Sequence, residues 1–509
     1  GEARRWAKLV GIPAALAYAL LVGDAPSAWR AAVTASLAWA LGVGGRRADP
    51  LGVTAGAALI LAALCPDDLA RPGFCLSIVA TAAIGYFLCP GREPWRAALI
   101  IATRTTCATA PFVVWIFGAL PVVGVLANLV VVPLSTVVLL PVLVLHAALA
   151  SFSIEIASLT APGAEGATRA FIAASEVFAA VPLGQDLPPL SVPQGIVLAI
   201  VCGALLGVQR WRTRALVVVA ASLALAGAEV HLRVTERPTG VVRATFLDVG
   251  QGDAALVDLP DGSLMVIDAG GSVGGGVDPG ARVLVPLLRA RRRSRIDVLV
   301  LTHPHPDHYG GIAALLEAFE VGEIWDSGQA SAEEPDGPIA TRLRASGVPI
   351  RGPPELCGQP RRFGEAVVRV RWPCPTFSSG WDANDNSLVL DLVFGARRFL
   401  FAGDAEAHAE GALLAMNLGT VDVLKVAHHG SRTSSGLPFL SAMHPEIALV
   451  SAGRNNRYGH PHPEVWYRIV AESCCALRTD RDGGVVVTTD GRDLDLTARR
   501  CNPRCRAER

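Results

Sequence analysis

Three histidines and one aspartate stand close together in the stretch THPHPDHYGG, directly after an apolar run that predicts a buried strand. Alternate side chains of an extended backbone share a face, so His303 and His305 should point the same way. Asp307 and His308 come round on the following turn. Imidazole and carboxylate ligands together suit borderline divalent ions such as zinc or manganese. The spacing therefore predicts two neighbouring metal sites where a strand opens into a loop.

Three later apolar runs also end in residues that can bind a metal or a phosphate. FLFAG leads to Asp404, VDVLKVA leads to His428, and IALVS leads through a polar loop to His460. A carboxylate at a strand tip, such as Asp404, can bridge two ions. Three roles stay open for His428: a metal ligand, a general acid, or a phosphate contact made with the Gly430 amide and the Ser431 hydroxyl. We expect all these strand ends to meet in one site.

The elements that must position this site belong to only one part of the chain. The 509 residues are 51% hydrophobic and 18% charged, with a mean hydropathy of +0.41, which is too apolar for an ordinary soluble enzyme. The apolar residues are concentrated before Leu232, in runs near the length of a membrane span. The candidate spans are Leu9–Val22, Trp29–Val43, Leu51–Cys65, Phe74–Cys89, Ala97–Leu120, Val122–Ala150, Ala170–Val181, Gly195–Val208 and Leu216–Ala226.

These runs predict a polytopic α-helical membrane domain with about seven to nine spans. Interior prolines at Pro111, Pro133 and Pro141 predict broken or re-entrant helices, which membranes tolerate where the freed backbone lines a cavity. Because the chain begins at Gly1 rather than at a methionine, we expect it to lack an N-terminal portion.

From about Val241 the sequence changes to alternating strand patterns, turns and amphipathic helices, which predict an α/β domain built as an αββα sandwich. The expected organisation is a membrane domain at 1–232, a linker at 233–240, the α/β domain at 241–498 and a tail at 499–509.

Charge and cysteine content narrow the function only slightly. The formal net charge is zero, so no global basic field marks a nucleic-acid binder, and local patches must carry any such binding. The arginine cluster at 289–295 is the densest patch, although a solvated helix end is the simpler interpretation. The eleven cysteines show no CxxC pair and no even framework of disulfides.

Longer motifs resemble a known family over nearly the whole chain. HxHxDH, the GD strand end and the later histidines resemble the metallo-β-lactamase superfamily. The runs FLDVGQGDAALV, LVLTHPHPDHYGG, NDNSLVL, FLFAGD, LKVAHHGSRTSS and YGHP resemble the C-terminal domain of the ComEC family of DNA-uptake channels. In the apolar half, GDAPSAWR, RADPL, GFCLS and GVLANLVVVPL are similar to the competence domain that precedes it in that family.

The resemblance implies two divalent metal ions, zinc or manganese, held by His303, His305, Asp307, His308, Asp404 and His460. His303 and His305 would hold the first ion, Asp307 and His308 the second, with Asp404 bridging and His460 closing the second site. The usual third histidine of the first site is missing, because its place near Asn384 and Asn386 carries none. We therefore expect the first site to be the weaker one.

Further roles follow by position. The expected catalytic residues are Asp307, Asp404 and His428. The expected contacts with substrate are Lys425, His429, Gly430, Ser431 and Arg432. The residues expected to orient the metal ligands are Asp248, Asp253, Asn384, Asn386 and Ser387.

The family implies a multi-pass inner-membrane channel that imports one strand of DNA while a metal-dependent nuclease domain degrades the other. Its partners would be DNA, the lipid bilayer and other competence uptake proteins, with oligomerisation left open, and the α/β domain would lie outside the cytoplasm. Two other functions remain to be weighed. One is a membrane-anchored metallohydrolase of a substrate that is not nucleic acid, and the other is a translocator with a non-catalytic module.

Overall fold

The chain forms two compact units, Gly1–Glu229 and Val230–Arg509, in a computed structural model that describes residues 2–23, 26–46, 49–66, 72–86, 93–118, 123–181, 188–271 and 278–498. The predicted domain limits at 232 and 240 stay predictions, and helix α10 runs across the first of them to Thr235. The predicted tail at 499–509 lies outside the described residues.

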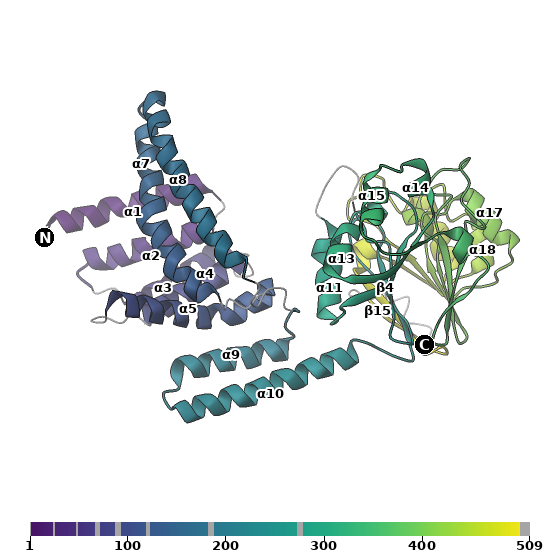
Figure 1. Cartoon of the computed structure of the whole chain (residues 1–509), viewed down its shortest axis with the longest axis horizontal. Coiled ribbons are helices and arrows are strands. Elements are labelled where there is room, and N and C mark those ends of the chain that lie inside the picture. The colour runs from purple at the N-terminus through teal and green to yellow at the C-terminus, as the bar shows by residue number, and fades with distance from the viewer. Residues whose placement is uncertain are drawn as a thin grey trace. The chain divides into compact units, whose positions relative to one another are not determined.

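The described part of the first unit is helical (Figure 1). Its helices are α1 (Glu2–Val22), α2 (Pro26–Val43), α3 (Pro50–Leu64), α4 (Pro72–Tyr86), α5 (Pro94–Phe117), α6 (Gly124–Pro133), α7 (Leu140–Ala150), α8 (Ile154–Ala179), α9 (Val192–Gly207) and α10 (Trp211–Thr235). Each predicted span falls on one of these helices, except Val122–Ala150, which covers α6, α7 and the turn η2 between them. The predicted span ends at Cys89, Leu120 and Val122 lie outside the described residues.

Among the described residues, three helical stretches are long and apolar enough to cross a membrane: Trp95–Phe117, Gly124–Ala150 and Trp211–Thr235. The long middle stretch is continuous although it contains two prolines. A π-helical turn, η2 (Leu134–Leu139), joins α6 to α7 directly after Pro133. Proline lacks the amide proton and crowds the preceding turn, so a wider turn lets the helix continue without a break. The predicted break at Pro111 is likewise not seen, since α5 runs through it.

The second unit contains two mixed β-sheets packed face to face. The first sheet has the order β15-β14-β1-β2-β3-β4-β5-β6, and the second has the order β13-β12-β11-β10-β9-β8-β7. The strands of the first sheet are β1 (Val242–Phe246), β2 (Ala255–Asp258), β3 (Leu264–Ile267), β4 (Arg295–Leu301), β5 (Glu320–Asp326), β6 (Ile350–Arg351), β14 (Val485–Thr489) and β15 (Leu494–Ala498). The strands of the second are β7 (Arg361–Phe363), β8 (Ala366–Trp372), β9 (Val389–Phe394), β10 (Arg397–Phe401), β11 (Val423–Lys425), β12 (Ile447–Val450) and β13 (Cys475–Arg478).

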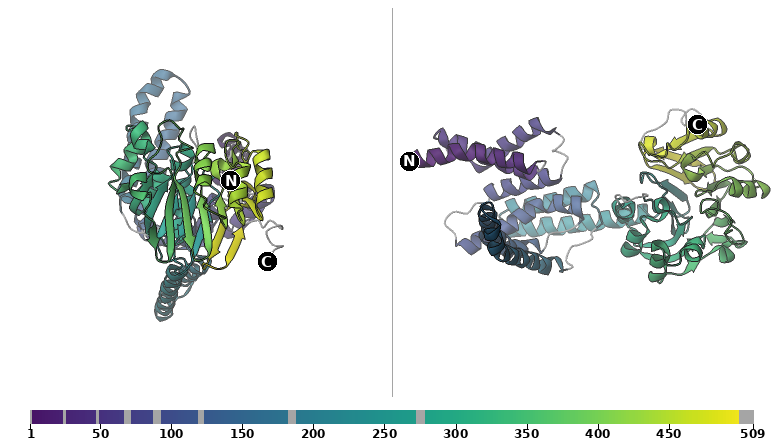
Figure 2. Two further views of the ribbon diagram at one scale, coloured as in Figure 1. Left: turned by 90° about the vertical axis from the view of Figure 1, so that its right-hand side faces the viewer. Right: turned by 90° about the horizontal axis from the view of Figure 1, so that it is seen from above.

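Helices cover the outer face of each sheet (Figure 2). On the first sheet and its connections lie η3 (Gly280–Leu284), α11 (Val285–Ala290), α12 (Pro306–Tyr309), α13 (Ile312–Ala318), α14 (Gln329–Glu333), α15 (Pro338–Ala345) and α16 (Pro353–Leu356). On the second lie α17 (Ala407–Ala415), the short turn η4 (Ala427–Gly430), α18 (Leu437–Met443), α19 (Pro463–Glu472) and α20 (Thr479–Asp482). The predicted αββα sandwich is confirmed.

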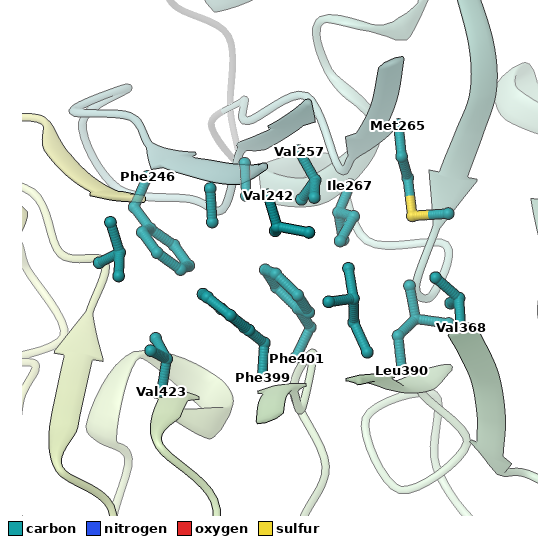
Figure 3. Packing of buried hydrophobic residues seen from close by; sticks show 14 of the residues in the cluster. Val242, Phe246, Val257, Met265, Ile267, Val368, Leu390, Phe399, Phe401 and Val423 are labelled. Atoms are coloured by element: carbon teal, nitrogen blue, oxygen red, sulfur yellow. The ribbon is translucent and has the colours of Figure 1, made fainter. Parts of the chain in front are cut away.

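The core lies between the two sheets (Figure 3). Alternate residues of each strand point inward, so Phe246 and Val257 of the first sheet face Phe399 and Phe401 of the second. The rings of Phe246 and Phe401 stack with their centroids 5.9 Å apart. This packing fixes one sheet against the other, and with it the relative position of the strand ends that carry the candidate ligands.

The middle of the arginine cluster at 289–295 is buried, whereas Arg295 at its end is exposed. Arg291 and Arg293 are buried and bind the fully buried carboxylate of Asp258, to which Arg243 also donates at 2.7 Å. A buried carboxylate needs such partners because its desolvation is costly. These arginines are therefore part of the core of the second unit.

Candidate metal centre

The candidate metal centre lies at one edge of the sandwich, where parallel strands of both sheets end. His303 and His305 follow β4, Asp404 follows β10, and the turn η4 with His428 and His429 follows β11. Strands β3 to β6 of the first sheet and β10 to β13 of the second run parallel within their sheets, so their carboxyl ends gather at one edge. A pocket of about 360 Å³ opens there, lined among others by His305, Asp307, Asp404, His428, His429 and His460.

One half of the centre is built around Asp404, His308 and His429, all of which are buried. His308 Nε2 lies 3.3 Å from Asp404 Oδ2, and His429 Nε2 lies 3.8 Å from the same oxygen and 3.4 Å from Asp307 Oδ2. The ring nitrogens that face away from the pocket are anchored. His308 Nδ1 donates to Asp268 at 2.8 Å, and His429 Nδ1 donates to the carbonyl oxygen of Ser451 at 3.1 Å. Such anchoring fixes a metal-binding histidine in the required tautomer and orientation.

The other half contains His303 and His305. The nitrogen atoms His303 Nε2 and His305 Nδ1 lie 3.0 Å apart, and His303 Nε2 lies 3.8 Å from Asp404 Oδ2. Asn386 is not free to assist, because its amide group is bonded to backbone atoms of residues 378, 381 and 382. Asn384 lines the pocket, and its Oδ1 atom is buried with no hydrogen-bond partner. Asn384 therefore offers an unpartnered carboxamide oxygen to the pocket, in the sequence region where the third histidine is missing.

The histidines and carboxylates of the centre shift one another's pKa values. Burial alone would lower the pKa of His308 and of His429, but Asp404 and other carboxylates outweigh it, raising the former well above its ordinary value and the latter to about 10. Burial would raise the pKa of Asp404, yet the charges on His308 and His429 hold it well below the ordinary range. For His303, burial dominates and lowers the pKa well below its ordinary value. Protons thus occupy one half of the centre and leave the other neutral.

These residues fit a divalent metal. Four of their buried polar atoms have no hydrogen-bond partner: Asp404 Oδ1, Asp253 Oδ1, His308 Nε2 and His429 Nε2. Two overlapping groups of three residues have their ligand atoms within 4.8 Å of one another. One group is His303, His308 and Asp404, and the other is Asp307, His308 and His429. Buried groups without partners are costly unless something binds them, and a metal ion does so for mixed nitrogen and oxygen ligands.

His428 belongs to the pocket in a different way. His428 Nδ1 lies 2.7 Å from Glu406 Oε1, and Thr433 Oγ1 donates to the same oxygen at 2.7 Å. Burial would lower the pKa of His428, but the hydrogen bond to Glu406 and the charge of Asp404 raise it. Its Nε2 atom is 3.8 Å from Asp404 Oδ2, so it faces the pocket. A carboxylate-oriented imidazole with a raised pKa is suited to donate a proton.

Both histidines of η4 owe their positions to a rare backbone conformation. His428 and His429 have φ angles of 46° and 52°, in the left-handed region that non-glycine residues seldom adopt. Strain of this kind persists where the surroundings enforce it, and it is concentrated at functional sites. Here it directs two consecutive imidazoles into the same pocket.

Glycines hold the HxHxDH loop against the neighbouring backbone. A Cβ atom on Gly271 would lie 1.8 Å from the Pro306 carbonyl oxygen, and one on Gly252 would lie 2.4 Å from that of Asp307. Both glycines have positive φ angles. Only glycine allows this close approach, so the QGD and AGG motifs seat the metal loop.

His460 lines the pocket but is not within the groups described above. Its ring stacks on that of His429 with centroids 6.2 Å apart, and burial together with the charges on His429 and His428 lowers its pKa to about 4. The sequence analysis assigned His429 to the substrate. In the structure its Nε2 atom faces the carboxylates of Asp307 and Asp404, which are expected ligands of the second ion.

Other predicted residues lie at varying distances from the pocket. Lys425 is buried and bonded to Asp253 at 2.8 Å, which corrects the prediction that it contacts substrate. Asp248 is exposed, whereas the sequence predicted an orienting role beside the ligands. Ser387 Oγ accepts a hydrogen bond from the Asp404 amide. Residues Gly430 and Ser431 are buried, and Arg432 donates to His462 at the surface.

The sequence analysis missed Glu406 and Asp268. Glu406 stands two residues after Asp404, in the loop that follows β10, so it was a second carboxylate close in sequence to a strand-end ligand. Asp268 ends the apolar run of β3 just as Asp404 ends that of β10, and it accepts hydrogen bonds from both the amide and the hydroxyl of Thr302. A carboxylate at or just after the end of an apolar strand was therefore the sequence signal that could have identified both residues.

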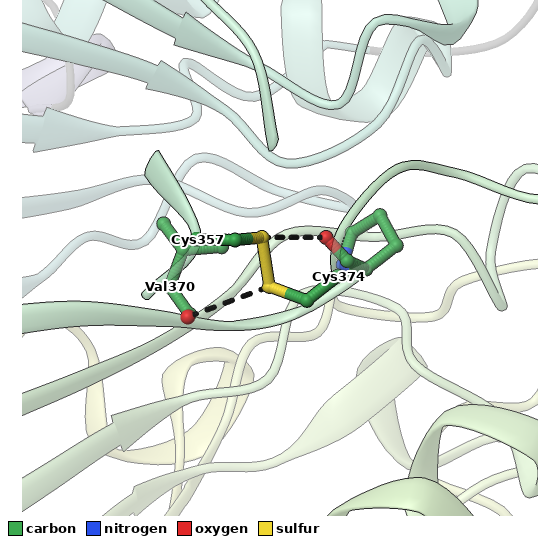
Figure 4. Close-up of a disulfide and its surroundings, with 4 residues drawn as sticks. Cys357, Val370 and Cys374 are labelled. Atoms are coloured by element: carbon green, nitrogen blue, oxygen red, sulfur yellow. Dashed lines mark hydrogen bonds between the residues drawn. A yellow bond between two sulfur atoms is a disulfide. The ribbon is translucent and has the colours of Figure 1, made fainter. Parts of the chain in front are cut away.

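A disulfide that the sequence analysis did not predict joins Cys357 to Cys374 (Figure 4). Cys357 follows α16, and Cys374 stands two residues after β8, at the start of the loop that carries Asn384. The sulfur of Cys374 lies 3.7 Å from the carbonyl oxygen of Val370. The bridge fixes the start of the loop that supplies the carboxamide of the metal centre.

Each of the two units matches a known protein family. Residues 1–214 match the family model described as competence protein, and residues 247–454 match that of the metallo-β-lactamase superfamily. The chain is 30% identical to competence protein ComA of Neisseria gonorrhoeae over 505 residues, which cover 95% of the chain and 65% of that protein. The chain is therefore similar to competence proteins in both of its units.

Other relatives match only part of the chain. ComE operon protein 3 of Bacillus subtilis is 33% identical over 47% of the chain and 32% of its own length. Recombination protein 2 of Haemophilus influenzae is 31% identical over 44% of the chain and 26% of its own length. The chain thus spans less than two thirds of each of these relatives.

Among solved structures, Zn²⁺-bound PqqB from Methylobacterium extorquens matches 46% of the chain and 97% of its own length, at 10% identity and a TM-score of 0.33. A likeness at this level supports no argument about function. The fold assignment of the second unit stands on the family match and on the two-sheet architecture.

Proposed function

We propose that this chain is a multi-pass inner-membrane DNA-uptake channel of the competence type, and that its second unit is a metal-dependent nuclease that degrades one strand while the other is imported. The observation that carries the nuclease assignment is the meeting of unpartnered nitrogen and oxygen atoms of His308, His429 and Asp404 beside a histidine oriented by Glu406. A module with only a structural role would gain nothing from keeping these buried atoms without partners.

In the proposed centre, Asp307, His308, Asp404 and His429 hold one divalent ion, zinc or manganese, while His303, His305 and Asp404 hold a second with help from Asn384. Bound ions of this kind supply a nucleophile at neutral pH and stabilise charge on phosphate oxygens. His428, oriented by Glu406, donates a proton to the leaving oxygen. His460 and Arg432 contact the DNA backbone, where donors and positive groups position a substrate without reading its sequence.

We propose that the second unit lies outside the cytoplasm. The disulfide between Cys357 and Cys374 supports this side, because disulfides form and persist in oxidising compartments and are rare in the cytosol. The lipid bilayer then surrounds the apolar helices, and other competence uptake proteins deliver the DNA. A homo-oligomer is compatible with this arrangement.

The direct test is DNA cleavage by the purified full chain in detergent, with an end-labelled duplex and added manganese or zinc. We expect the wild-type chain to release nucleotides from one strand, and Asp404→Asn to release none. The matched control is Asp493→Asn, an exposed aspartate between β14 and β15, which should cleave as the wild type does. Metal-loaded wild-type protein that leaves DNA intact, or an active Asp404→Asn variant, would contradict the proposal.

A test of the membrane side uses thiol labelling in intact cells. After reduction with a reagent that cannot cross the inner membrane, Cys357 and Cys374 should react with a membrane-impermeant maleimide. Reaction only after the cells are permeabilised would place the second unit in the cytoplasm.

A further inference from the structure

A second cavity, of about 710 Å³, lies beside the metal pocket in the second unit. Its walls come from the segment after η4 and from α19, and the residues are Arg432, Pro463, Glu464, Tyr467 and Arg468. None of these residues takes part in the metal groups described above. The cavity is therefore separate from the metal groups, and of its lining residues only Arg432 has been given a role above.

The two cavities are joined by a short segment of chain. His460 lines the metal pocket and Pro463 lines the second cavity, so only the two residues between them separate the linings along the chain. The amide of His462 donates to the Gly430 carbonyl oxygen at 2.9 Å, and Arg432 Nε donates to His462 Nε2 at 2.7 Å. These bonds hold Arg432, which stands three residues after His429, against the segment that runs from one cavity lining to the other.

The chemistry of the second cavity suits an extended nucleic-acid strand. Arg432 and Arg468 supply two guanidinium groups against the one carboxylate of Glu464. Arg468 Nε is buried without a hydrogen-bond partner. Tyr467 is 78% exposed although it lines the cavity, so its ring is open to a planar group. Arginines beside an open aromatic ring are how proteins hold single strands, with the phosphates on the charges and a base on the ring.

We propose that this cavity binds the single-stranded segment of DNA next to the phosphodiester that is cleaved, and this inference rests on the proposed nuclease function. Arg432 and Arg468 contact phosphates, and the Tyr467 ring stacks on an unpaired base. A duplex would not bind in the same way, because its bases are already stacked and paired. The cavity would thereby hold the strand that is being degraded.

The test measures DNA binding by the full chain in detergent, with EDTA present so that no cleavage occurs. The probe is a fluorescein-labelled oligothymidylate of about twelve nucleotides, within the usual range of single-strand sites. Tyr467→Leu should weaken binding by about 5- to 150-fold, the loss expected for one stacked base, whereas Tyr467→Phe should bind as the wild type. Arg468→Gln should lower the slope of log affinity against log salt by about 0.7.

Three further measurements separate binding from folding. Glu464→Gln should bind the probe more tightly than the wild type, because it removes the only carboxylate among the lining residues, and a damaged fold would not produce a gain. Arg492→Gln, an exposed arginine before β15, is the charge-matched control and should bind unchanged. A dinucleotide probe should respond less to Tyr467→Leu than the longer probe does.

The proposal is overturned if Tyr467→Leu binds the probe as tightly as the wild type, or if Tyr467→Phe loses as much affinity as Tyr467→Leu. It is also overturned if Glu464→Gln binds the probe no more tightly than the wild type does. The same holds if Tyr467→Leu weakens the binding of a duplex probe as much as that of the single strand. Because all these measurements are made without metal, they stand apart from the cleavage assay. If the nuclease proposal is wrong, the DNA stays intact in the cleavage assay, whatever the binding measurements show.

Discussion

The two halves of the metal centre differ in how completely their ligands are prepared. Around Asp404, both His308 and His429 have one ring nitrogen anchored to the protein and the other unpartnered in the pocket. In the other half, only His303 has such an anchor, because its Nδ1 atom lies 3.2 Å from Thr302 Oγ1, while its Nε2 atom is in contact with His305. The carboxamide of Asn384 lines the same pocket. The difference teaches that two sites of one centre need not be equal, since orientation from outside the ligand set decides how much freedom is lost on binding.

The comparison leads to a clear order of binding. The half made by Asp307, His308, Asp404 and His429 should fill first and hold its ion more tightly. The half made by His303 and His305 should fill second, because its ligands must first separate from each other. Asp404 takes part in both halves, so it is the residue whose loss should affect both.

The largest effect is expected for Asp404→Asn, which should remove both ions and all DNA cleavage. In the metal-free protein the change also removes the one counter-charge that His308 and His429 share in the pocket. Breaking a buried ion pair in this way costs about 3–5 kcal/mol of unfolding free energy. Metal content by mass spectrometry, cleavage and chemical denaturation check the three outcomes. Retention of a full ion in Asp404→Asn would show that the halves do not share it.

The next effect separates His429 from His460 as the residue that closes the tighter half. His429→Gln should lower the affinity for the first ion by at least about 10- to 100-fold. His460→Gln should bind the first ion as the wild type does, while cleaving DNA more slowly. Competition with a chromophoric zinc chelator measures both affinities. If His460→Gln rather than His429→Gln loses the first ion, the original sequence-based assignment is right.

A smaller effect concerns pH and distinguishes the halves by their protons. The pKa of His429 is raised to about 10 and that of His308 is raised as well, so both imidazoles are protonated at pH 7 without metal. A metal binds only the neutral ring, so the first ion must displace protons and its affinity must rise as pH rises. The pKa of His303 is lowered, so this histidine adds no proton release for the second ion.

Calorimetry in buffers with different ionisation enthalpies, between pH 6 and about 9, measures the protons released for each ion. We expect the first ion to release more protons than the second. Equal release for both ions would remove the distinction between the halves.

The smallest effect on metal binding is expected for removal of the disulfide in Cys357→Ala/Cys374→Ala. The bridge closes a loop with a sequence separation of 17, so its loss should cost about 3 kcal/mol of unfolding free energy. It tethers the loop of Asn384, so the second ion should be weakened while the first keeps its affinity. Denaturant unfolding and zinc competition check both statements. A weaker first ion would show that the bridge supports the whole centre instead.

Much of the fold follows from the sequence for simple physical reasons. Long apolar runs must leave water, so the predicted spans fall on helices of the first unit. Strand alternation and the GD and HxHxDH motifs predict the sandwich and the edge where ligands gather. The continuity of the helix through Pro133 could not be predicted, because a π-helical turn that absorbs a proline leaves no mark in composition.

The site was predictable in its first motif and less so in its later ones. The HxHxDH spacing is local, so sequence alone places His303 to His308 together. Choosing between His429 and His460 depends on the left-handed backbone of η4, which arises from packing and not from residue type. Lys425 seemed suited to DNA because of its charge, but a buried Asp253 on another strand end takes it as a partner. Burial of that kind is decided by tertiary contacts far apart in the sequence.

The most direct test of the unequal metal centre is the position of the first ion. The full chain, stripped of metal and given one equivalent of zinc, would be crystallised and its anomalous difference map recorded at the zinc edge. The account predicts a single strong peak among Asp307, His308, Asp404 and His429. A peak between His303 and His305, or two peaks of equal height, would contradict it.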